Sequence, residues 1–272
     1  MTRIAVIGGG RIGEALIAGL LESGRASKDL VVCEPVAARG ELLAQRFGVR
    51  VTGEVADAAT GADLIVIAVK PGDVDGVLTD LAKIELGNDS DAVLVSLVAG
   101  VPTLRFENKL PAGFPVVRVM PNTPMLVGQG MSAIAAGRYA RKEQLALVTE
   151  MLESVGKVVT VSEPQMDAVT AVSGSGPAYF FLVVEAMIDA SVGLGLTRDV
   201  ATQLVVQTML GSAALLEESG QSAVELRAAV TSPAGTTAAA LRELERGAVR
   251  SAFHEALNAA KRRSAEQGAV AD

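Results

Sequence analysis

The first thirteen residues constrain the fold more than any other part of the chain. Arg3–Ile7 is a short, mostly apolar run, followed at once by Gly8, Gly10 and Gly13 in the spacing G-x-G-x-x-G. The first glycine permits a tight turn, the second lets a diphosphate approach the backbone, and the third lets a helix pack closely on the strand. This pattern predicts a strand, a phosphate-binding turn and a helix that open a dinucleotide-binding sheet.

The start of that helix and a more distant acidic residue complete the predicted dinucleotide site. Arg11 and Ile12 open the helix, where free backbone N–H groups bind phosphate. Glu34 lies 21 positions after Gly13, where an acidic side chain binds ribose hydroxyls and repels the 2′-phosphate of NADPH. Arg11 and Arg39 are cations that could offset this repulsion. The sequence therefore predicts a nicotinamide cofactor, NADPH or NADH, and leaves the choice between them open.

Apolar runs alternate with helical patterns through the first half of the chain. The runs are rich in Val, Ile and Leu, as parallel strands buried on both faces are. They are Arg3–Ile7, Leu30–Cys33, Leu64–Val69, Ala92–Val98, Val116–Met120, Ser132–Ala135 and Val158–Val161. Helical patterns at 12–23, 36–47 and 142–155 separate some of them. The predicted fold class is α/β, with an N-terminal Rossmann-type, doubly wound parallel sheet.

The strand rhythm stops near residue 162, and only helical patterns follow. They cover 177–192, 198–218, 223–230, 233–245 and 249–267 and are rich in Ala, Gly and Ser. We therefore predict a dinucleotide-binding domain over 1–162 and an all-α domain over 163–272. The mean hydropathy of +0.39 is high for a soluble monomer. A second subunit is expected to cover apolar surface on the helical part.

Composition argues against several function classes. The net charge is −7 and no long basic run exists, so nucleic acid is not an expected partner. Cys33 and His254 are the only residues of their types, so no metal cluster of these ligands is expected. The N-terminus lacks the pattern of a secretory signal. The longest apolar region, Pro177–Leu196, carries Glu185 and Asp189 and is interpreted as a buried helix rather than a membrane span. We expect a cytoplasmic protein.

Five further segments resemble pyrroline-5-carboxylate reductases in their order and spacing. They are Ala68-Val69-Lys70-Pro71, Val98-Ala99-Gly100, Met120-Pro121-Asn122-Thr123-Pro124, Ser173-Gly174-Ser175-Gly176-Pro177-Ala178-Tyr179 and Ser232-Pro233-Ala234-Gly235-Thr236-Thr237. The resemblance extends along nearly the whole chain, and the last two segments together are highly specific. The chain departs from the family at Ala234, where a second glycine is usual.

The resemblance implies an activity and an assembly. The activity is reduction of L-1-pyrroline-5-carboxylate to L-proline by NAD(P)H, the last step of proline biosynthesis. The assembly is an interlocked homodimer built by the helical domain, with larger rings of dimers in some members. The first two segments, 68–71 and 98–100, are implied to line the cofactor cleft. Asn122 and Thr123 are implied to lie near the nicotinamide.

The resemblance also implies a substrate site. One wall is formed by Ser173, Ser175 and Gly176, and the other by residues 232–237. Thr237 is then the catalytic residue, because its hydroxyl hydrogen-bonds the substrate nitrogen.

The last segment also suggests an anion site from its residue types. Ser232 is a favourable N-cap, and Pro233 is favoured as the first helical residue. The N–H groups of Ala234, Gly235 and Thr236 would then have no partner inside the helix and would be free to bind a carboxylate. The alternative interpretation is an ordinary capped helix.

The second half of the chain is poor in groups that donate protons. It has no lysine between Lys157 and Lys261, and His254 lies among helical residues. Reduction of a ketone creates an alkoxide, which normally needs a Lys, His or Tyr donor or a metal. A cyclic imine binds already protonated and needs less help, so the composition favours an imine substrate.

Two alternative functions stay open on the sequence alone. A β-hydroxyacid dehydrogenase of the 6-phosphogluconate type would share the domain order, but it would need a catalytic lysine early in the helical half. A non-catalytic dinucleotide sensor would use the helical half only for subunit contacts.

Overall fold

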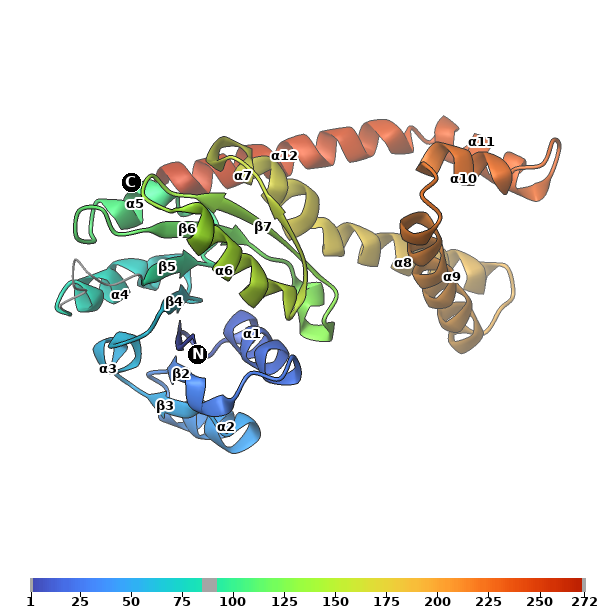
Figure 1. Cartoon of the computed structure of the whole chain (residues 1–272). Coiled ribbons are helices and arrows are strands. Elements are labelled where there is room, and N and C mark those ends of the chain that lie inside the picture. The colour runs from blue at the N-terminus through green and yellow to red at the C-terminus, as the bar shows by residue number, and fades with distance from the viewer. Residues whose placement is uncertain (1, 85–91, 271–272) are drawn as a thin grey trace. The chain divides into compact units, whose positions relative to one another are not determined.

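The computed structural model describes residues 2–84 and 92–270, with side chains up to Gly268. By packing, the chain forms two compact units (Figure 1). Unit 1 comprises Met1–Ser175 and Ala260–Asp272, and unit 2 comprises Gly176–Ala259. The division predicted from sequence lies at residue 162. The compact units instead keep residues 163–175 and 260–272 with the sheet.

Unit 1 is built on an eight-stranded sheet with the order β3-β2-β1-β4-β5-β6-β7-β8. The strands are β1 (Ile4–Ile7), β2 (Leu30–Cys33), β3 (Arg50–Thr52), β4 (Leu64–Ile67), β5 (Val93–Ser96), β6 (Val116–Met120), β7 (Gly130–Ala136) and β8 (Gly156–Thr160). The chain runs outward from β1 to β3 and returns to β4 on the other side of β1. This reversal makes the carboxyl ends of β1 and β4 a topological switch point, where such sheets bind ligands.

The predicted α/β sheet is confirmed, with two differences. Strand β3 was not expected, because it has three residues and none of them is fully buried. Strand β7 pairs antiparallel with β6, whereas the other pairings are parallel. The segment 121–129 between β6 and β7 is too short for the crossover that a parallel neighbour needs, so the chain reverses direction there.

The helices of unit 1 cover both faces of the sheet (Figure 1). One face carries α1 (Arg11–Glu22), α2 (Ala37–Phe47) and α6 (Lys142–Glu153), and the other carries α3 (Val55–Ala59), α4 (Val74–Leu81) and α5 (Thr103–Glu107). Along β1, Ile4 and Val6 pack in the core beneath α1, α2 and α6, whereas Ala5 and Ile7 pack in the core beneath α3, α4 and α5. All four are at most 1% exposed, so the strand must be apolar at every position.

Residues 163–175 pack on the sheet because their side chains are tied to it. They form the short helices η4 (Glu163–Gln165) and α7 (Met166–Val169) and the π-turn η5 (Thr170–Gly174). Met166 is fully buried against Ala133 and Ala135 of β7. Oε1 of Glu163 accepts a hydrogen bond from buried Arg118 on β6, with 2.9 Å between Nη1 and Oε1. Residues that follow the last strand therefore belong to the packed core of the sheet.

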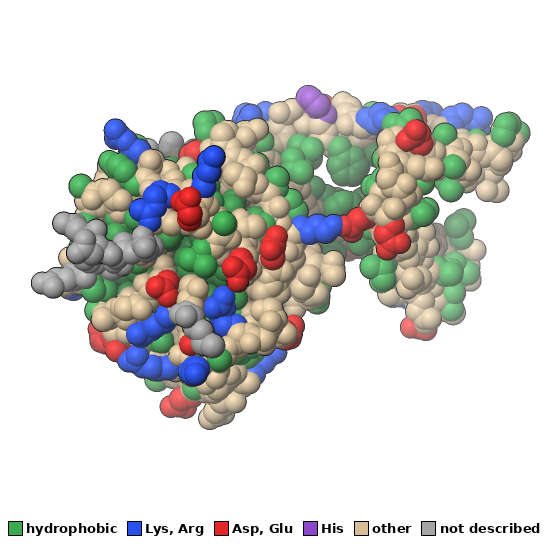
Figure 2. Space-filling view, in the orientation of Figure 1, with side chains coloured by type: hydrophobic (Ala, Val, Ile, Leu, Met, Phe, Trp, Pro, Cys, Tyr) green, Lys and Arg blue, Asp and Glu red, His purple; other side chains and the backbone are tan. Residues whose placement is uncertain are grey.

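Unit 2 contains long helices with little core of their own. It comprises α8 (Gly176–Gly193), α9 (Arg198–Glu218), α10 (Ala223–Ala229), α11 (Thr236–Arg246) and the first part of α12 (Val249–Val270). Within this fully described unit, Ala201 and Val205 are the only buried apolar side chains. Figure 2 shows apolar side chains at its surface.

The interpretation of Pro177–Leu196 as a buried helix is wrong for the single chain. Phe181 and Leu182 on α8 are 63% and 64% exposed. By length and composition, Glu163–Gly193 and Arg198–Glu218 would also pass as membrane spans, although this is weak evidence. The helices are apolar on several sides, so their periodicity does not show what covers them.

Candidate functional site

Three glycines shape the turn between β1 and α1. A methyl group added to Gly13 would lie 2.1 Å from the carbonyl oxygen of Gly8, and one added to Gly8 would lie 2.7 Å from that of Ala68. The packing of the protein itself therefore requires glycine at both positions. A methyl group on Gly10 would meet nothing within 4 Å. Glycine at position 10 leaves open space beside the backbone, which fits the close approach of a diphosphate.

The first turn of α1 offers backbone donors beside this open space. Gly10 is the N-cap and no side chain caps the helix. The first intrahelical bond in this turn runs from Glu14 N to Gly10 O, at 2.8 Å, so the N–H groups of Arg11, Ile12 and Gly13 have no partner inside the helix. Such a helix start attracts anions. The residues present therefore fit a dinucleotide diphosphate.

Glu34 holds the glycine turn against the end of β2. Its Oε2 accepts from Gly9 N at 3.0 Å, and its Oε1 accepts from Val36 N at 2.9 Å. Burial, and next the charge of Glu34, raise the pKa of the neighbouring Cys33 thiol to about 11. The thiol is therefore neutral at pH 7, which fits a packing role at the strand end.

Arg39 on α2 is hydrogen-bonded to the same turn. Its Nε donates to the carbonyl oxygen of Gly9 at 2.9 Å, and its guanidinium forms an ion pair with Glu14 on α1. Glu14 also pairs with Arg46. These contacts cross-link α1, α2 and the glycine turn. The sequence identified Arg39 only as a candidate for phosphate binding, because its partner lies 25 residues earlier.

The segments after β4 and β5 lie at the same carboxyl edge of the sheet. The strand ladder continues past β4, since Ala68 N donates to Ile7 O at 2.8 Å. Val69 is half-buried, Lys70 is exposed and Pro71 opens the short helix η2 (Pro71–Asp73). Val98 and Gly100 are buried and Ala99 is exposed. These predicted cofactor residues thus lie near one another. Their individual contacts with a cofactor stay predictions.

The end of α12 covers the loop after β5, which sequence reasoning missed. A methyl group on Gly268 would lie 3.0 Å from the carbonyl oxygen of Gly100. Together the two elements enclose a cavity of about 300 Å³, lined by Pro71, Ala99, Gly100, Val101, Arg263, Glu266 and Gln267. Ser264 anchors this end of α12 by donating to Asp167 Oδ1 at 2.8 Å. No local sequence pattern indicates that the C-terminal helix packs on a loop so far away in the sequence.

Asn122 joins three segments of unit 1. Its Nδ2 donates to the carbonyl oxygen of Ser173 at 3.1 Å, and its Oδ1 accepts from Met131 N at 2.8 Å. The next residue, Thr123, is exposed at the start of η3 (Thr123–Val127). The Asn122 side chain therefore positions the backbone of the serine–glycine segment, and a direct contact with the nicotinamide stays a prediction.

The serine–glycine segment adopts a π-turn. Ser175 N donates to Thr170 O at 2.8 Å, and Ser173 Oγ donates to Val169 O at 3.2 Å. A methyl group on Gly174 would lie 2.4 Å from Cε of Met120, so this glycine permits close packing on the end of β6. Single π-turns are frequent at functional sites. Gly176 is buried and begins α8.

The loop before α11 differs from the prediction. The N-cap is Gly235 rather than Ser232, and α11 begins at Thr236. The Gly235 amide is not free, because it donates to Ser232 O at 3.1 Å across a tight turn. Ala239 N makes the first helical bond, to Gly235 O. The unpaired amides are therefore those of Thr236, Thr237 and Ala238, shifted along the chain from the expected 234–236.

Ala234 is the reason for this shift. Its φ is +58°, in the left-handed region that favours glycine. The backbone thus keeps the conformation for which the family uses a second glycine, although a side chain is present.

Ala234→Gly is expected to stabilise the protein by about 0.5–1 kcal/mol, because relief of the left-handed strain outweighs the added chain entropy of the unfolded state. Urea unfolding monitored by circular dichroism would measure the change. Ala240→Gly, within the regular part of α11, should instead lower stability by up to about 1 kcal/mol. Equal destabilisation by both substitutions would contradict strain at Ala234.

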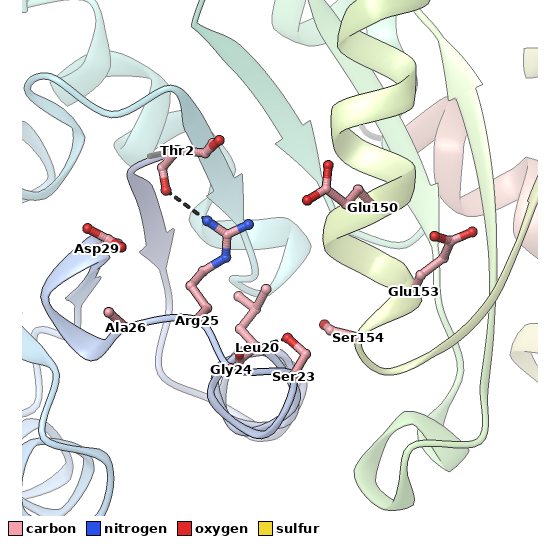
Figure 3. A pocket seen from close by; sticks show the side chains of 10 residues that line it. All are labelled: Thr2, Leu20, Ser23, Gly24, Arg25, Ala26, Asp29, Glu150, Glu153 and Ser154. Carbon is pink, nitrogen blue, oxygen red and sulfur yellow. Dashed lines mark hydrogen bonds between the residues drawn. The ribbon is translucent and has the colours of Figure 1, made fainter.

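A larger cavity lies at the opposite, amino edge of the sheet (Figure 3). Its volume is about 650 Å³, and it lies where α1 and α6 end. Asp29, Glu150 and Glu153 line it, and Arg25 donates from Nη1 to Thr2 O at 2.9 Å. Carboxylates and two helix C-termini give this cavity a negative potential. It is unsuited to a diphosphate or a substrate carboxylate, so the candidate site is at the carboxyl edge.

Comparisons with known proteins agree with this geometry. Residues 163–267 match the family model described as pyrroline-5-carboxylate reductase dimerisation, and residues 3–100 match the model described as NADP oxidoreductase, coenzyme F420-dependent. The pyrroline-5-carboxylate reductase of Mycobacterium tuberculosis is 54% identical, over 97% of this chain and 96% of that protein. The Corynebacterium melassecola enzyme is 47% identical, over 98% and 99% respectively.

Solved structures give the same result. A pyrroline-5-carboxylate reductase from Coxiella burnetii has a TM-score of 0.93 and 37% identity, with 98% of both chains covered. A Plasmodium falciparum pyrroline carboxylate reductase with NADP bound has a TM-score of 0.86 and 29% identity, again with 98% of both chains covered. Sequence and structure agree over nearly the full length, so the chain belongs to the pyrroline-5-carboxylate reductase family.

Proposed function

We propose that this chain reduces L-1-pyrroline-5-carboxylate to L-proline in the last step of proline biosynthesis. The reaction consumes one NAD(P)H and one proton for each imine reduced. The observation that carries the proposal is the presence of two uncapped helix starts, on α1 and α11, in a chain of this family. One suits a diphosphate and the other a carboxylate.

The chain's own residues bind and orient the reactants in this proposal. The amides at Arg11–Gly13 hold the diphosphate, and those of Thr236 and Thr237 hold the substrate carboxylate. Ser173 and Ser175 are further substrate-binding residues in this proposal. The half-buried Thr237 side chain hydrogen-bonds the ring nitrogen. A nicotinamide, when bound, would supply the hydride to the imine carbon, which is C2 of the pyrroline ring and becomes Cδ of proline.

The scarcity of proton donors in unit 2 suits this chemistry. The imine is protonated when it binds, and arrival of the hydride removes its positive charge. Positioning by a hydroxyl and by backbone amides is therefore enough, without a strong general acid. The same region has no lysine from 158 to 260, which disfavours a dehydrogenase of the 6-phosphogluconate type.

The assembly that we propose is a homodimer through the helical unit, and larger rings of such dimers. Its support is the match of residues 163–267 to the family's dimerisation model and the apolar surface of α8 and α9. A second copy, rather than a membrane, is proposed to cover that surface. Cytoplasmic localisation follows as part of the proposal.

Thr237→Ala tests the role of the hydroxyl. We expect kcat to fall about 100-fold, as when one positioned donor is removed from a reacting centre. The affinity for the cofactor alone should change less than about twofold, since the hydroxyl lies outside the proposed diphosphate site. Thr237→Ser keeps the hydroxyl and should restore most of the rate. The measurement is NAD(P)H oxidation with pyrroline-5-carboxylate, and a wild-type rate in Thr237→Ala would remove Thr237 from the site.

The same assay separates the proposed function from its alternatives. A dinucleotide sensor would bind NAD(P)H and oxidise none with the imine. A hydroxyacid dehydrogenase would reduce NAD(P)⁺ with a hydroxy acid and ignore the imine.

A further inference from the structure

The choice between NADH and NADPH depends on what surrounds the adenosine ribose. In sheets of this type the residue after the second strand lies beside the ribose hydroxyls. Here that residue is Glu34, whose orientation is fixed, because its two oxygens accept from the amides of Gly9 and Val36. Each carboxylate oxygen has a second lone pair that can accept from a ribose hydroxyl.

The segment after Glu34 offers no side chain that would bind a 2′-phosphate. Pro35, Val36, Ala37 and Ala38 are exposed and carry neither a hydroxyl nor a charge. A 2′-phosphate would add up to two negative charges and only acceptor oxygens. Placed beside the Glu34 carboxylate, it would be repelled and could not replace the hydroxyl donor.

The two nearby arginines do not reverse this balance. The guanidinium of Arg39 donates to the Gly9 carbonyl and shares the Glu14 carboxylate with Arg46, so its Nε and Nη2 are already engaged within the protein. Arg11 is exposed and opens α1, which places it on the diphosphate side of the turn. A charge there attracts NADH and NADPH alike.

We propose that this protein selects NADH over NADPH and that Glu34 is the residue that excludes the 2′-phosphate. The inference rests on the proposed function only in taking a nicotinamide dinucleotide as the ligand of the glycine turn. It concerns the residues of this chain, whatever cofactor its relatives use.

The test is a pair of fluorescence titrations, with NADH and with NADPH, in the absence of any imine. The wild-type Kd for NADPH should exceed that for NADH at least tenfold. In Glu34→Gln the charge is removed and the size is kept, so the ratio of the two Kd values should fall at least tenfold, mainly through tighter binding of NADPH. A wild-type ratio near or below one, or an unchanged ratio in Glu34→Gln, would overturn the proposal.

Two control variants test whether the cofactor preference depends on Glu34 specifically. Glu41→Gln removes an exposed acid from α2 and should leave the ratio as in the wild type. Arg11→Ala should weaken both cofactors by the same factor. A selective loss of NADPH affinity in Arg11→Ala would show that Arg11 receives the 2′-phosphate and would overturn the proposal. If Glu34→Gln folds poorly, Glu34→Ser also removes the charge. The ratio of its two Kd values, compared with the wild-type ratio, then tests the proposal in the same way.

These titrations are independent of turnover. A chain that prefers NADH but oxidises none with pyrroline-5-carboxylate would contradict the proposed function and leave this inference standing. A chain that reduces the imine equally well with both cofactors, and binds both equally, would support the proposed function and contradict this inference.

Discussion

The Leu210→Asp variant should sediment as a monomer at micromolar concentration and reduce no imine. Leu210 lies on α9 and is 61% exposed in the single chain. If a second copy covers this surface, the substitution buries an unpaired carboxylate in an apolar interface. That costs on the order of 4 kcal/mol, or about a thousandfold in dimer affinity. Because unit 2 has only Ala201 and Val205 as buried apolar side chains, loss of the partner should also unfold its helices.

The matched control for this variant is Leu104→Asp on α5 of unit 1. Leu104 is also 61% exposed, so the chemical change and the exposure are the same. This variant should remain dimeric and active, and analytical ultracentrifugation with circular dichroism would compare the two. A dimeric, active Leu210→Asp protein would contradict an interface on this side of α9.

Gly13→Ala is expected to weaken cofactor binding at least about 100-fold and to lower stability by about 3 kcal/mol, near the upper range for a group forced into a packed site. The added methyl group would lie 2.1 Å from the carbonyl oxygen of Gly8. That oxygen belongs to backbone, so α1 must move away from β1. The amides that bind the diphosphate move with the helix, which couples the loss of stability to the loss of binding.

Two other glycines separate these effects. Gly10→Ala places a methyl group in open space, so the thermal midpoint should be retained while NADH binding falls, because the methyl group occupies the approach to the backbone. Gly76→Ala, also in open space but on α4 rather than at the glycine turn, should leave NADH binding unchanged and should not lower the thermal midpoint. If Gly10→Ala bound NADH as the wild type does, the diphosphate would not lie against this turn.

The local parts of the fold could be predicted from the sequence. The strands β1, β2 and β4 and the helices α1 and α2 each have an apolar pattern that determines their burial, whatever surrounds them. The glycine spacing at 8, 10 and 13 likewise specifies its own turn. The family could be recognised because its site segments are short and contiguous. For these features neighbouring residues carry the information.

Other features depended on residues far apart in the sequence. Ser232-Pro233 has the composition of a helix start, yet the left-handed Ala234 delays α11 to Thr236. Arg39 is a free cation in the sequence, whereas its pairing with Glu14 becomes visible only when α1 and α2 pack side by side. The end of α12 returns to Gly100 across more than half of the chain.

The sequence by itself determined the strand–glycine–helix unit, the α/β class and the family, because each follows from a local pattern of side chains. The tertiary structure decided the antiparallel β7, the partners of Glu34 and Arg39, the free amides at Thr236 and Thr237, and the exposure of α8 and α9. The physical reason is that hydrogen bonds and burial between distant segments depend on where the chain brings them together. Periodicity and residue type indicate only that a polar, charged or apolar group needs an interaction partner. The fold determines which residue that partner is.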